Sequence, residues 1–222
     1  MLTAVNWAEF WPPVQLSLQV ASLSCVIVLV LGVLAARWIR RSRIRGKLML
    51  ETIFMLPLVL PPTVVGFLLL VILGRRSWLG QWIEWLFHAS VIFSWWAAVL
   101  ASIVVAFPLV YQTMKTAFDA VDRSLEDSAR SAGAGEWQVF RYITLPMSYP
   151  SLLTAAILGF ARSLGEFGAT LMIAGNIPNK TQTVPTAIYV AVDAGNQTMA
   201  WAWTIAIVLI SFIMLLVARR KT

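Results

Sequence analysis

The chain has 222 residues, of which 59% are hydrophobic and only 12% are charged. A soluble domain of this length carries about twice that charged fraction, so the composition excludes a water-soluble protein and indicates one covered by lipid. The formal net charge of +7 would fit nucleic-acid binding, but the basic residues are grouped in particular loops, and we expect no nucleic-acid partner.

Five apolar stretches are long enough to cross a bilayer, which takes about 20 helical residues. Helices are expected because lipid offers no hydrogen-bond partner to an unpaired backbone group. The sequence therefore predicts an all-α integral membrane protein with about five transmembrane helices in a single domain, 1–222. The predicted spans are Val14–Ala36, Leu48–Leu73, Ala89–Tyr111, Ser151–Ala174 and Ala200–Ala218.

The basic residues are distributed unevenly between the two sides of this predicted bundle. On one side lie 13 of the 17, whereas Arg75, Arg76 and Lys180 lie on the other and Arg162 lies inside a span. Cytoplasmic loops carry the excess of Lys and Arg. We therefore expect the N-terminus outside and the C-terminus in the cytoplasm. The 13 are Arg37, Arg40, Arg41, Arg43, Arg45, Lys47, Lys115, Arg123, Arg130, Arg141, Arg219, Arg220 and Lys221.

Two features of the second predicted span and the segment after it leave alternatives open. The span contains Pro57, Pro61 and Pro62, each of which removes a backbone donor. This indicates either a broken helix beside a translocation pathway or a tolerated kink. The tryptophan-rich outer segment Gly74–His88 suits the headgroup boundary, and the alternative is a sixth short crossing or a half-helix over Trp78–Phe87.

The loop Gln112–Pro150 is the longest hydrophilic segment of the chain. Its first part has apolar and small residues at helical spacing. Two acid-to-base pairs with a spacing of four residues, Asp119 with Arg123 and Glu126 with Arg130, would support this helix.

The second part of the loop begins at Gly133-Ala134-Gly135, which predicts a helix stop. A second short helix is expected over Glu136–Tyr142, with Pro146 ending the unit. Two short helices joined at glycines suit a docking surface for a partner. The alternative is a loop that packs on its own membrane domain.

The spacing within this loop favours the docking surface. Asp127-Ser128-Ala129, three residues, Gly133, nine residues and Ile143-Thr144-Leu145-Pro146 follow one another. This order resembles the loop signature of ABC-importer permeases, Glu-Ala-Ala, three residues, Gly, nine residues, Ile-x-Leu-Pro, with Asp127 and Ser128 as departures. The resemblance implies a type I importer permease whose cytoplasmic coupling helices dock on an ATPase. It implies coupling residues at Asp127, Ser128, Ala129, Gly133, Trp137, Phe140, Ile143, Leu145 and Pro146.

The sequence contains no Gly-x-x-x-x-Gly-Lys-Ser/Thr phosphate-binding motif. We therefore expect a transport subunit that is not an enzyme and binds no cofactor or metal. The ATP and Mg would be used by a separate P-loop ATPase. The resemblance also implies a homodimer of permeases in the bacterial cytoplasmic membrane.

The fourth predicted span carries Arg162, Glu166 and Thr170 at intervals of four residues, on one face of a continuous helix. Ionisable groups in a span usually face a bundle interior or water. This pattern indicates either an ion pair that holds helices together or residues that line a pathway. The predicted pathway or gate residues are Arg162, Glu166, Thr170, Pro61, Pro62 and Thr63. A small-residue ladder for helix packing is expected at Ala161, Gly165 and Ala169.

Several segments are also similar to molybdate permeases. These segments are Leu56–Gly66, Ala161–Thr170, Gly175–Pro178 and Lys180–Pro185. Asn179 stands where glycine is common, and Asn tolerates left-handed backbone better than most residues. The resemblance implies an external oxyanion-binding protein that delivers the cargo. Sulfate and thiosulfate permeases share much of the pattern, so another oxyanion stays an alternative.

Two other classes of protein fit the sequence less well. A membrane-embedded enzyme would use Arg162 and Glu166 as catalysts, but the single histidine, His88, and the single cysteine, Cys25, lie far apart in the chain. An ion-coupled transporter is disfavoured because no internal repeat is visible, and it would leave the loop signature unexplained.

Overall fold

The computed structural model describes residues 5–42 and 44–219, so Arg43, Arg220 and Lys221 of the charge argument lie outside the described residues. All regular structure within these ranges is helical, which confirms the predicted all-α class. In chain order the helices are α1 (Trp7–Arg41), α2 (Lys47–Val59), α3 (Pro62–Leu73), α4 (Trp78–Phe87), α5 (Trp95–Asp119), α6 (Arg123–Ser131), α7 (Glu136–Val139), the π-helix η1 (Phe140–Thr144), α8 (Leu145–Met147), α9 (Tyr149–Leu164), α10 (Gly168–Ala174), α11 (Val184–Asp193) and α12 (Gln197–Arg219).

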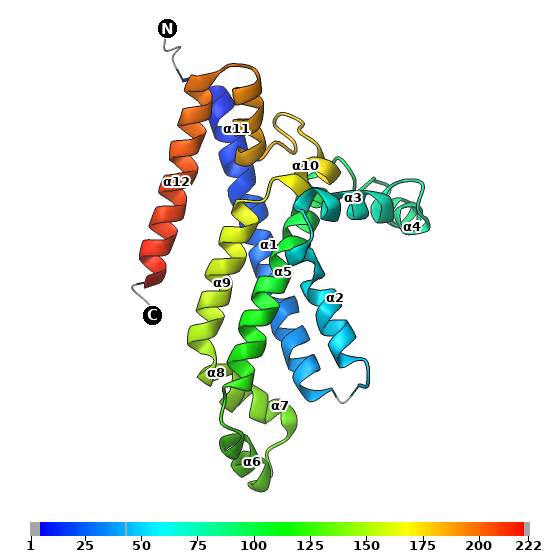
Figure 1. Cartoon of the computed structure of the whole chain (residues 1–222), viewed down its shortest axis with the longest axis vertical. Coiled ribbons are helices and arrows are strands. Elements are labelled where there is room, and N and C mark those ends of the chain that lie inside the picture. The colour runs from blue at the N-terminus through cyan, green and yellow to red at the C-terminus, as the bar shows by residue number, and fades with distance from the viewer. Residues whose placement is uncertain (1–4, 43, 220–222) are drawn as a thin grey trace.

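The centre of the molecule is formed by α1, α5 and α9, which pack on one another (Figure 1). Val110 of α5 lies between a glycine from each neighbour. A Cβ atom at Gly32 of α1 would lie 2.7 Å from Val110 Cγ1, and one at Gly159 of α9 would lie 2.9 Å from Val110 Cγ2. The missing side chains thus let the three helices approach closely.

The described residues contain three to five candidate membrane spans. Three helices, α1, α5 and α12, are each long and apolar enough to cross, and two bent pairs raise the number to five if each pair is one span. One bent pair, α2 with α3, corresponds to the second predicted span. The other, Glu136–Met147 with Tyr149–Leu164, overlaps the fourth predicted span only in α9, since that span was predicted to continue through α10 to Ala174. The third predicted span, Ala89–Tyr111, was wrong at both ends, because α5 begins at Trp95 and continues to Asp119, about two turns beyond Tyr111. The start of the predicted loop is therefore helical.

The second span is broken at Pro61 and Pro62 rather than kinked, while Pro57 lies inside α2. Leu60 and Pro61 have extended backbone, with ψ of 142° and 134°, because each precedes a proline and is thereby kept out of the helical region. Pro62 then begins α3, at a position where a helix needs no amide donor. The axes of α2 and α3 differ by 114°.

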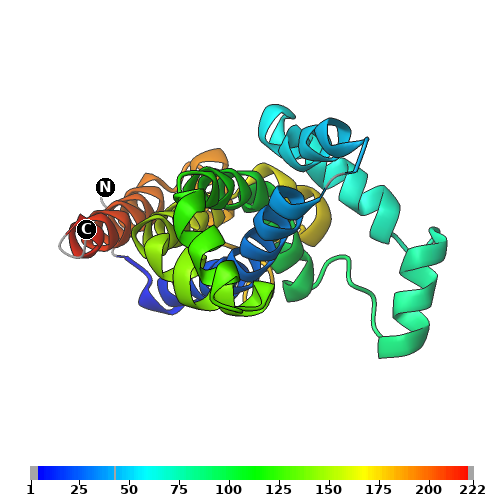
Figure 2. The ribbon, with the colours of Figure 1, turned by 90° about the horizontal axis from the view of Figure 1, so that it is seen from below.

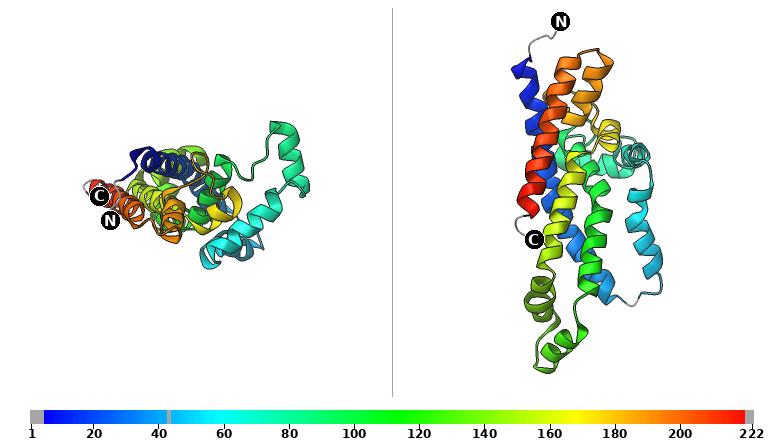
Figure 3. Two further views of the ribbon diagram at one scale, coloured as in Figure 1. Left: turned by 90° about the horizontal axis from the view of Figure 1, so that it is seen from above. Right: turned by 60° about the vertical axis from the view of Figure 1, so that its left-hand side comes forward.

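The outer segment forms α4, a helix of ten residues. At 1.5 Å per residue it is about 15 Å long, half the hydrocarbon thickness, which is too short for the sixth crossing. Figures 2 and 3 show α3 and α4 extending away from the three-helix centre. The side chains of Trp78, Trp82 and Trp85 are exposed.

The two ends of the molecule differ in content. The beginning of α1, the α11–α12 hairpin and α4 are remote from α6 and α7, which lie at the lower end in Figure 1. The arginine-rich end of α1 reaches the same lower end as α6 and α7. Three arginines of the basic side, Arg37, Arg40 and Arg41, thus contact the predicted coupling loop.

Candidate functional site

The first half of the coupling loop is built around two local signals. The carboxylate of Asp122 accepts a hydrogen bond from the backbone N–H of Ser124 at 2.9 Å and so starts α6. Gly133 ends it with φ +90°, while Ala134 N–H donates to Ala129 O and Gly133 N–H donates to Arg130 O. These two bonds are the Schellman arrangement that closes a helix, and the predicted glycine stop is confirmed.

The second half of the loop is one short bent helical segment, α7, η1 and α8. Gly135 precedes it, and its N–H donates to the side-chain oxygen of Gln138 at 2.7 Å. The predicted end at Pro146 was wrong. Pro146 lies in the first turn of α8, where a helix tolerates proline, and the chain turns at Ser148 instead.

One predicted ion pair of the loop was also wrong. Asp119 and Arg123 do not share a helix, because α5 ends at Asp119 and α6 starts at Arg123. Asp119 instead lies 3.7 Å from Arg40 of α1. The other predicted pair is confirmed, with Arg130 Nη2 3.6 Å from Glu126 Oε2.

The predicted coupling residues divide into an exposed group and a half-buried group. Asp127, Ser128, Gly133, Trp137 and Pro146 are exposed, with Trp137 at 58% of its surface. Ala129, Ile143 and Leu145 are half-buried.

Phe140 departs from this prediction, because its side chain is buried and packs edge-on against Phe118 at 5.8 Å. It therefore cannot form part of a contact surface. The guanidinium of Arg37 in α1 lies 4.0 Å from the Phe140 ring centre and 4.7 Å from that of Trp137. This cation–π contact with α1 holds Trp137 in place.

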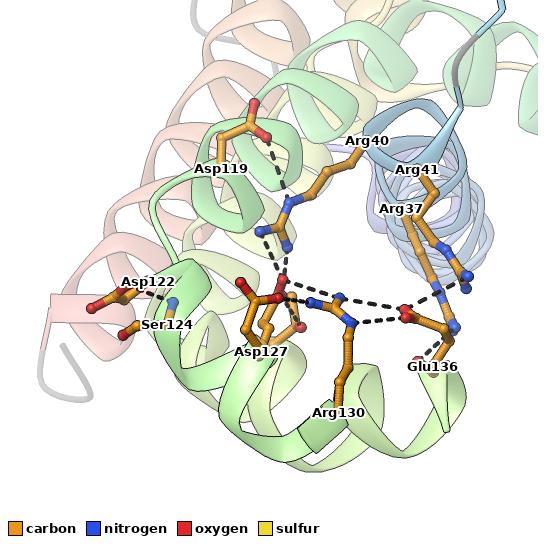
Figure 4. A network of polar contacts seen from close by, with 11 residues as sticks. Arg37, Arg40, Arg41, Asp119, Asp122, Ser124, Asp127, Arg130 and Glu136 are labelled. Carbon is orange, nitrogen blue, oxygen red and sulfur yellow. Dashed lines mark hydrogen bonds and ion pairs between the residues drawn. The ribbon is translucent and has the colours of Figure 1, made fainter. Parts of the chain in front are cut away.

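Glu126 contacts Arg40, Arg130 and Thr144 at this end of the molecule. Figure 4 shows the polar network to which Arg40 and Arg130 belong. Arg40 Nη1 and Nη2 donate to its two carboxylate oxygens at 2.8 and 3.2 Å, and Thr144 Oγ1 donates to Oε1 at 2.6 Å. Burial raises the pKa of Glu126, but the hydrogen bonds from Thr144 and Arg40 outweigh it and leave the pKa below its usual range.

A more exposed layer of charges surrounds Glu126. Arg130 Nε donates to Glu136 at 2.8 Å and its Nη1 donates to Asp127 at 2.6 Å, while Arg41 lies 3.6 Å from Glu136. The hydrogen bond from Arg130 lowers the pKa of Glu136. These contacts surround a concavity of about 500 Å³. Exposed pairs stabilise a fold little, so the layer serves orientation more than stability.

The second group of predicted residues lies where α9 ends and α10 begins. Arg162 Nη1 donates to Glu166 Oε2 at 2.8 Å, which confirms the predicted ion pair. The other oxygen, Oε1, accepts the backbone N–H of Ala169 at 2.8 Å and so satisfies a free donor at the start of α10. Glu166 is buried and joins the two helices across their break.

The break corrects two predictions about this span. Thr170 does not share a helical face with Arg162, because the chain leaves the helix between Leu164 and Gly168. The small-residue ladder Ala161, Gly165 and Ala169 is divided in the same way, with the first two exposed and Ala169 buried.

Ala169 nevertheless serves close packing, against α3 rather than along its own helix. A Cβ atom at Gly66 would lie 2.7 Å from Ala169 Cα. One at Gly168 would lie 3.2 Å from Pro62 Cβ and from the Thr63 backbone nitrogen. The structure therefore brings the two broken spans together at their breaks, although the sequence places them about 100 residues apart.

Chains of two solved ABC transporters share this fold. One belongs to a bacterial transporter that imports the polysaccharide alginate, with a TM-score of 0.78, 18% identity, and 97% of this chain and 79% of that chain covered. The other belongs to the MetNI methionine transporter, with a TM-score of 0.74, 16% identity, and 98% and 97% covered. The fold is therefore that of membrane chains of ABC importers.

Residues 28–220 match the family of binding-protein-dependent transport system inner membrane components, and the chain belongs to this family. The Bacillus subtilis protein YvgM, named for a molybdenum transport system permease, is 58% identical over 219 residues, covering 99% of this chain and 96% of its own. The molybdenum transport system permease protein ModB of Escherichia coli (strain K12) is 43% identical over 209 residues, covering 94% and 91%. Membership makes the chain a transport component of the membrane rather than an enzyme, as predicted.

Proposed function

We propose that the chain is the transmembrane permease of an ATP-driven molybdate importer. The observation that carries this proposal is the near-complete alignment with two permeases named for molybdenum transport, at 58% and 43% identity. In this proposal two copies form the pathway, and an external oxyanion-binding protein delivers the cargo. A cytoplasmic P-loop ATPase, which uses ATP and Mg, drives transport.

In this proposal the exposed surface around Trp137 and Asp127 contacts the ATPase. Support comes from the glycine stop at Gly133, which turns the chain between α6 and α7, and from the exposed apolar side chains beside it. Leu125, Tyr142 and Met147 are 43%, 69% and 53% exposed at the same end. Large exposed aromatic residues commonly anchor protein interfaces.

The pathway in this proposal runs beside the two helix breaks. Arg162 keeps 27% of its side chain exposed while pairing with the buried Glu166. Glu166 engages only Nη1 of Arg162, so the other guanidinium N–H groups can donate to a passing oxyanion, while the paired charge keeps the anion from binding tightly. The hydroxyl of Thr63, which is exposed in the first turn of α3 beside this break, is a further donor for the oxyanion.

The coupling surface can be tested with two tryptophans of similar exposure. Trp137→Ala should abolish co-purification with the ATPase, or ATP-driven uptake of labelled molybdate in proteoliposomes, because it removes the anchor of the surface. Trp201 is 64% exposed at the start of α12, remote from the loop, so Trp201→Ala is the matched control. Full association and full uptake by the Trp137 variant would contradict the coupling role.

Cargo and orientation need separate measurements. Excess unlabelled molybdate should compete with labelled molybdate far better than sulfate does, and equal competition would favour a general oxyanion permease. A reporter active only outside the cytoplasm should work when inserted at Asn179 and fail at Gly135. The reverse result would overturn the orientation and the coupling loop with it.

A further inference from the structure

Two acidic side chains, those of Glu126 and Glu166, are buried. Among the residues whose burial the structure describes, Glu126 and Glu166 are the only charged side chains that are buried. Glu166 bridges the break between α9 and α10, whereas Glu126 lies in the coupling loop, one position before the signature residue Asp127. A buried ion pair contributes little stability compared with apolar residues of similar volume. Stability alone therefore does not account for Glu126.

The partners of Glu126 come from separate parts of the bundle. Arg40 is in the last turn of α1, and Thr144 is in η1, the segment that leads into α9. Arg40 also lies 3.7 Å from Asp119 at the end of α5. The Glu126 carboxylate on α6 thus contacts the end of α1 through Arg40 and η1 through Thr144.

The contacts of Glu126 add to two short backbone connections of α6. A short turn, 120–122, joins α6 to α5, and the glycine turn at Gly133 joins it to α7. The contacts that join α6 to α1 and to η1 are made by side chains. The two hydrogen bonds from Arg40 restrict the orientation of the Glu126 carboxylate as well as its distance, because a bidentate contact adds geometric specificity.

We propose that Glu126 is a positioning residue that locks the coupling helix α6 to α1 and to the start of α9. A displacement of α6 by the ATPase then moves the inner ends of both spans as one body. The inference rests on the proposed function, since it assumes that the ATPase acts on this loop. It assigns Glu126, which the signature omits, a role in transmitting the movement rather than in contacting the ATPase.

The test compares ATP hydrolysis with uptake in proteoliposomes that contain the full chain, its ATPase and the binding protein, with molybdate as the transported anion. Glu126→Gln keeps the shape and removes the charge. We expect the ATPase to stay bound and active while molybdate uptake per ATP falls about 5- to 150-fold, the usual range of coupling between two sites. Arg40→Gln and Thr144→Val, which each remove one partner, should lower the same ratio.

Non-additive effects of two substitutions would show that Glu126 and Arg40 act through one shared contact. Arg40→Gln should have little further effect in a Glu126→Gln background, since both changes remove one contact. Arg123→Gln removes a positive charge from the same helix and the same concavity, and it should leave the ratio unchanged. Glu126→Asp should recover part of the coupling.

The outcomes separate this inference from the proposed function. A wild-type ratio in assembled Glu126→Gln complexes, or fully additive effects of the Arg40 and Glu126 changes, would overturn the locking role alone. An equal loss of bound ATPase and of uptake would also overturn it, since Glu126 would then be needed for docking or folding. Absence of ATP-driven molybdate uptake by the wild-type complex would instead contradict the proposed function.

Discussion

Removal of Arg162 should destabilise the protein more than neutralisation of Glu166. The two side chains form one ion pair, but they differ in burial, since 27% of the Arg162 side chain is exposed and only 1% of the Glu166 side chain. Arg162→Met leaves a carboxylate charged and buried without its partner, which costs about 3–5 kcal/mol. Glu166→Gln keeps the acceptor for the Ala169 N–H and lets the arginine turn toward water. It should cost about 1.5–3 kcal/mol, the range for a hydrogen bond to a charged group.

The double variant makes the test sharper. Arg162→Met combined with Glu166→Gln contains no stranded charge, so it should be more stable than Arg162→Met alone. Thermal unfolding in one detergent, followed by the fluorescence of the tryptophans, gives the comparison. At about 2–4 °C per kcal/mol for a chain of this size, Arg162→Met should lower the midpoint by at least about 6 °C.

The order of the unfolding midpoints tests whether Arg162 and Glu166 form one buried ion pair. Equal midpoints for the two single variants would mean that burial does not distinguish the residues. A double variant that unfolds below both single variants would mean that the pair is not the unit of stability. Either result would refute the assignment of Glu166 as a buried carboxylate held by Arg162.

Three further predictions concern single positions. Gly66→Ala should lower stability by about 1–3 kcal/mol, because its Cβ would overlap Ala169; Gly46→Ala, with open space around the new atom, is the control for the same unfolding assay. Gly133→Val should lower the free energy of unfolding by about 1–2 kcal/mol through its left-handed backbone alone, since nothing lies near the added Cβ. Gly133→Asn should reduce ATPase association less than Gly133→Val does, because Asn tolerates this backbone better. The lowered pKa of Glu126 means that its stabilising contribution is complete above its usual pKa and is lost as the pH falls through the folded-state value. The unfolding midpoint of Glu126→Gln should therefore depend less on pH at the acidic end than that of the wild type.

The sequence by itself determined the features that depend on neighbouring residues. Apolar length predicts the spans, because lipid requires a helix of a certain length whatever its partners are. The consecutive prolines Pro61 and Pro62 predict the break, because proline restricts its own backbone and that of the residue before it. Gly133, at φ +90°, and Asn179, at φ +61°, occupy the left-handed positions that their residue types suit.

Only the tertiary structure decided which distant segments meet. Arg40 and Glu126 are 86 positions apart, and neither belongs to a motif that would pair them. The packing of Gly168 on Pro62 and the burial of Phe140 likewise depend on how each helix is rotated about its axis. That rotation is set by the summed packing of α1, α5 and α9, to which every buried side chain contributes a little. No short stretch of sequence determines this summed packing, so the contacts of Glu126 with Arg40 and Thr144 could not be predicted before the helices were assembled.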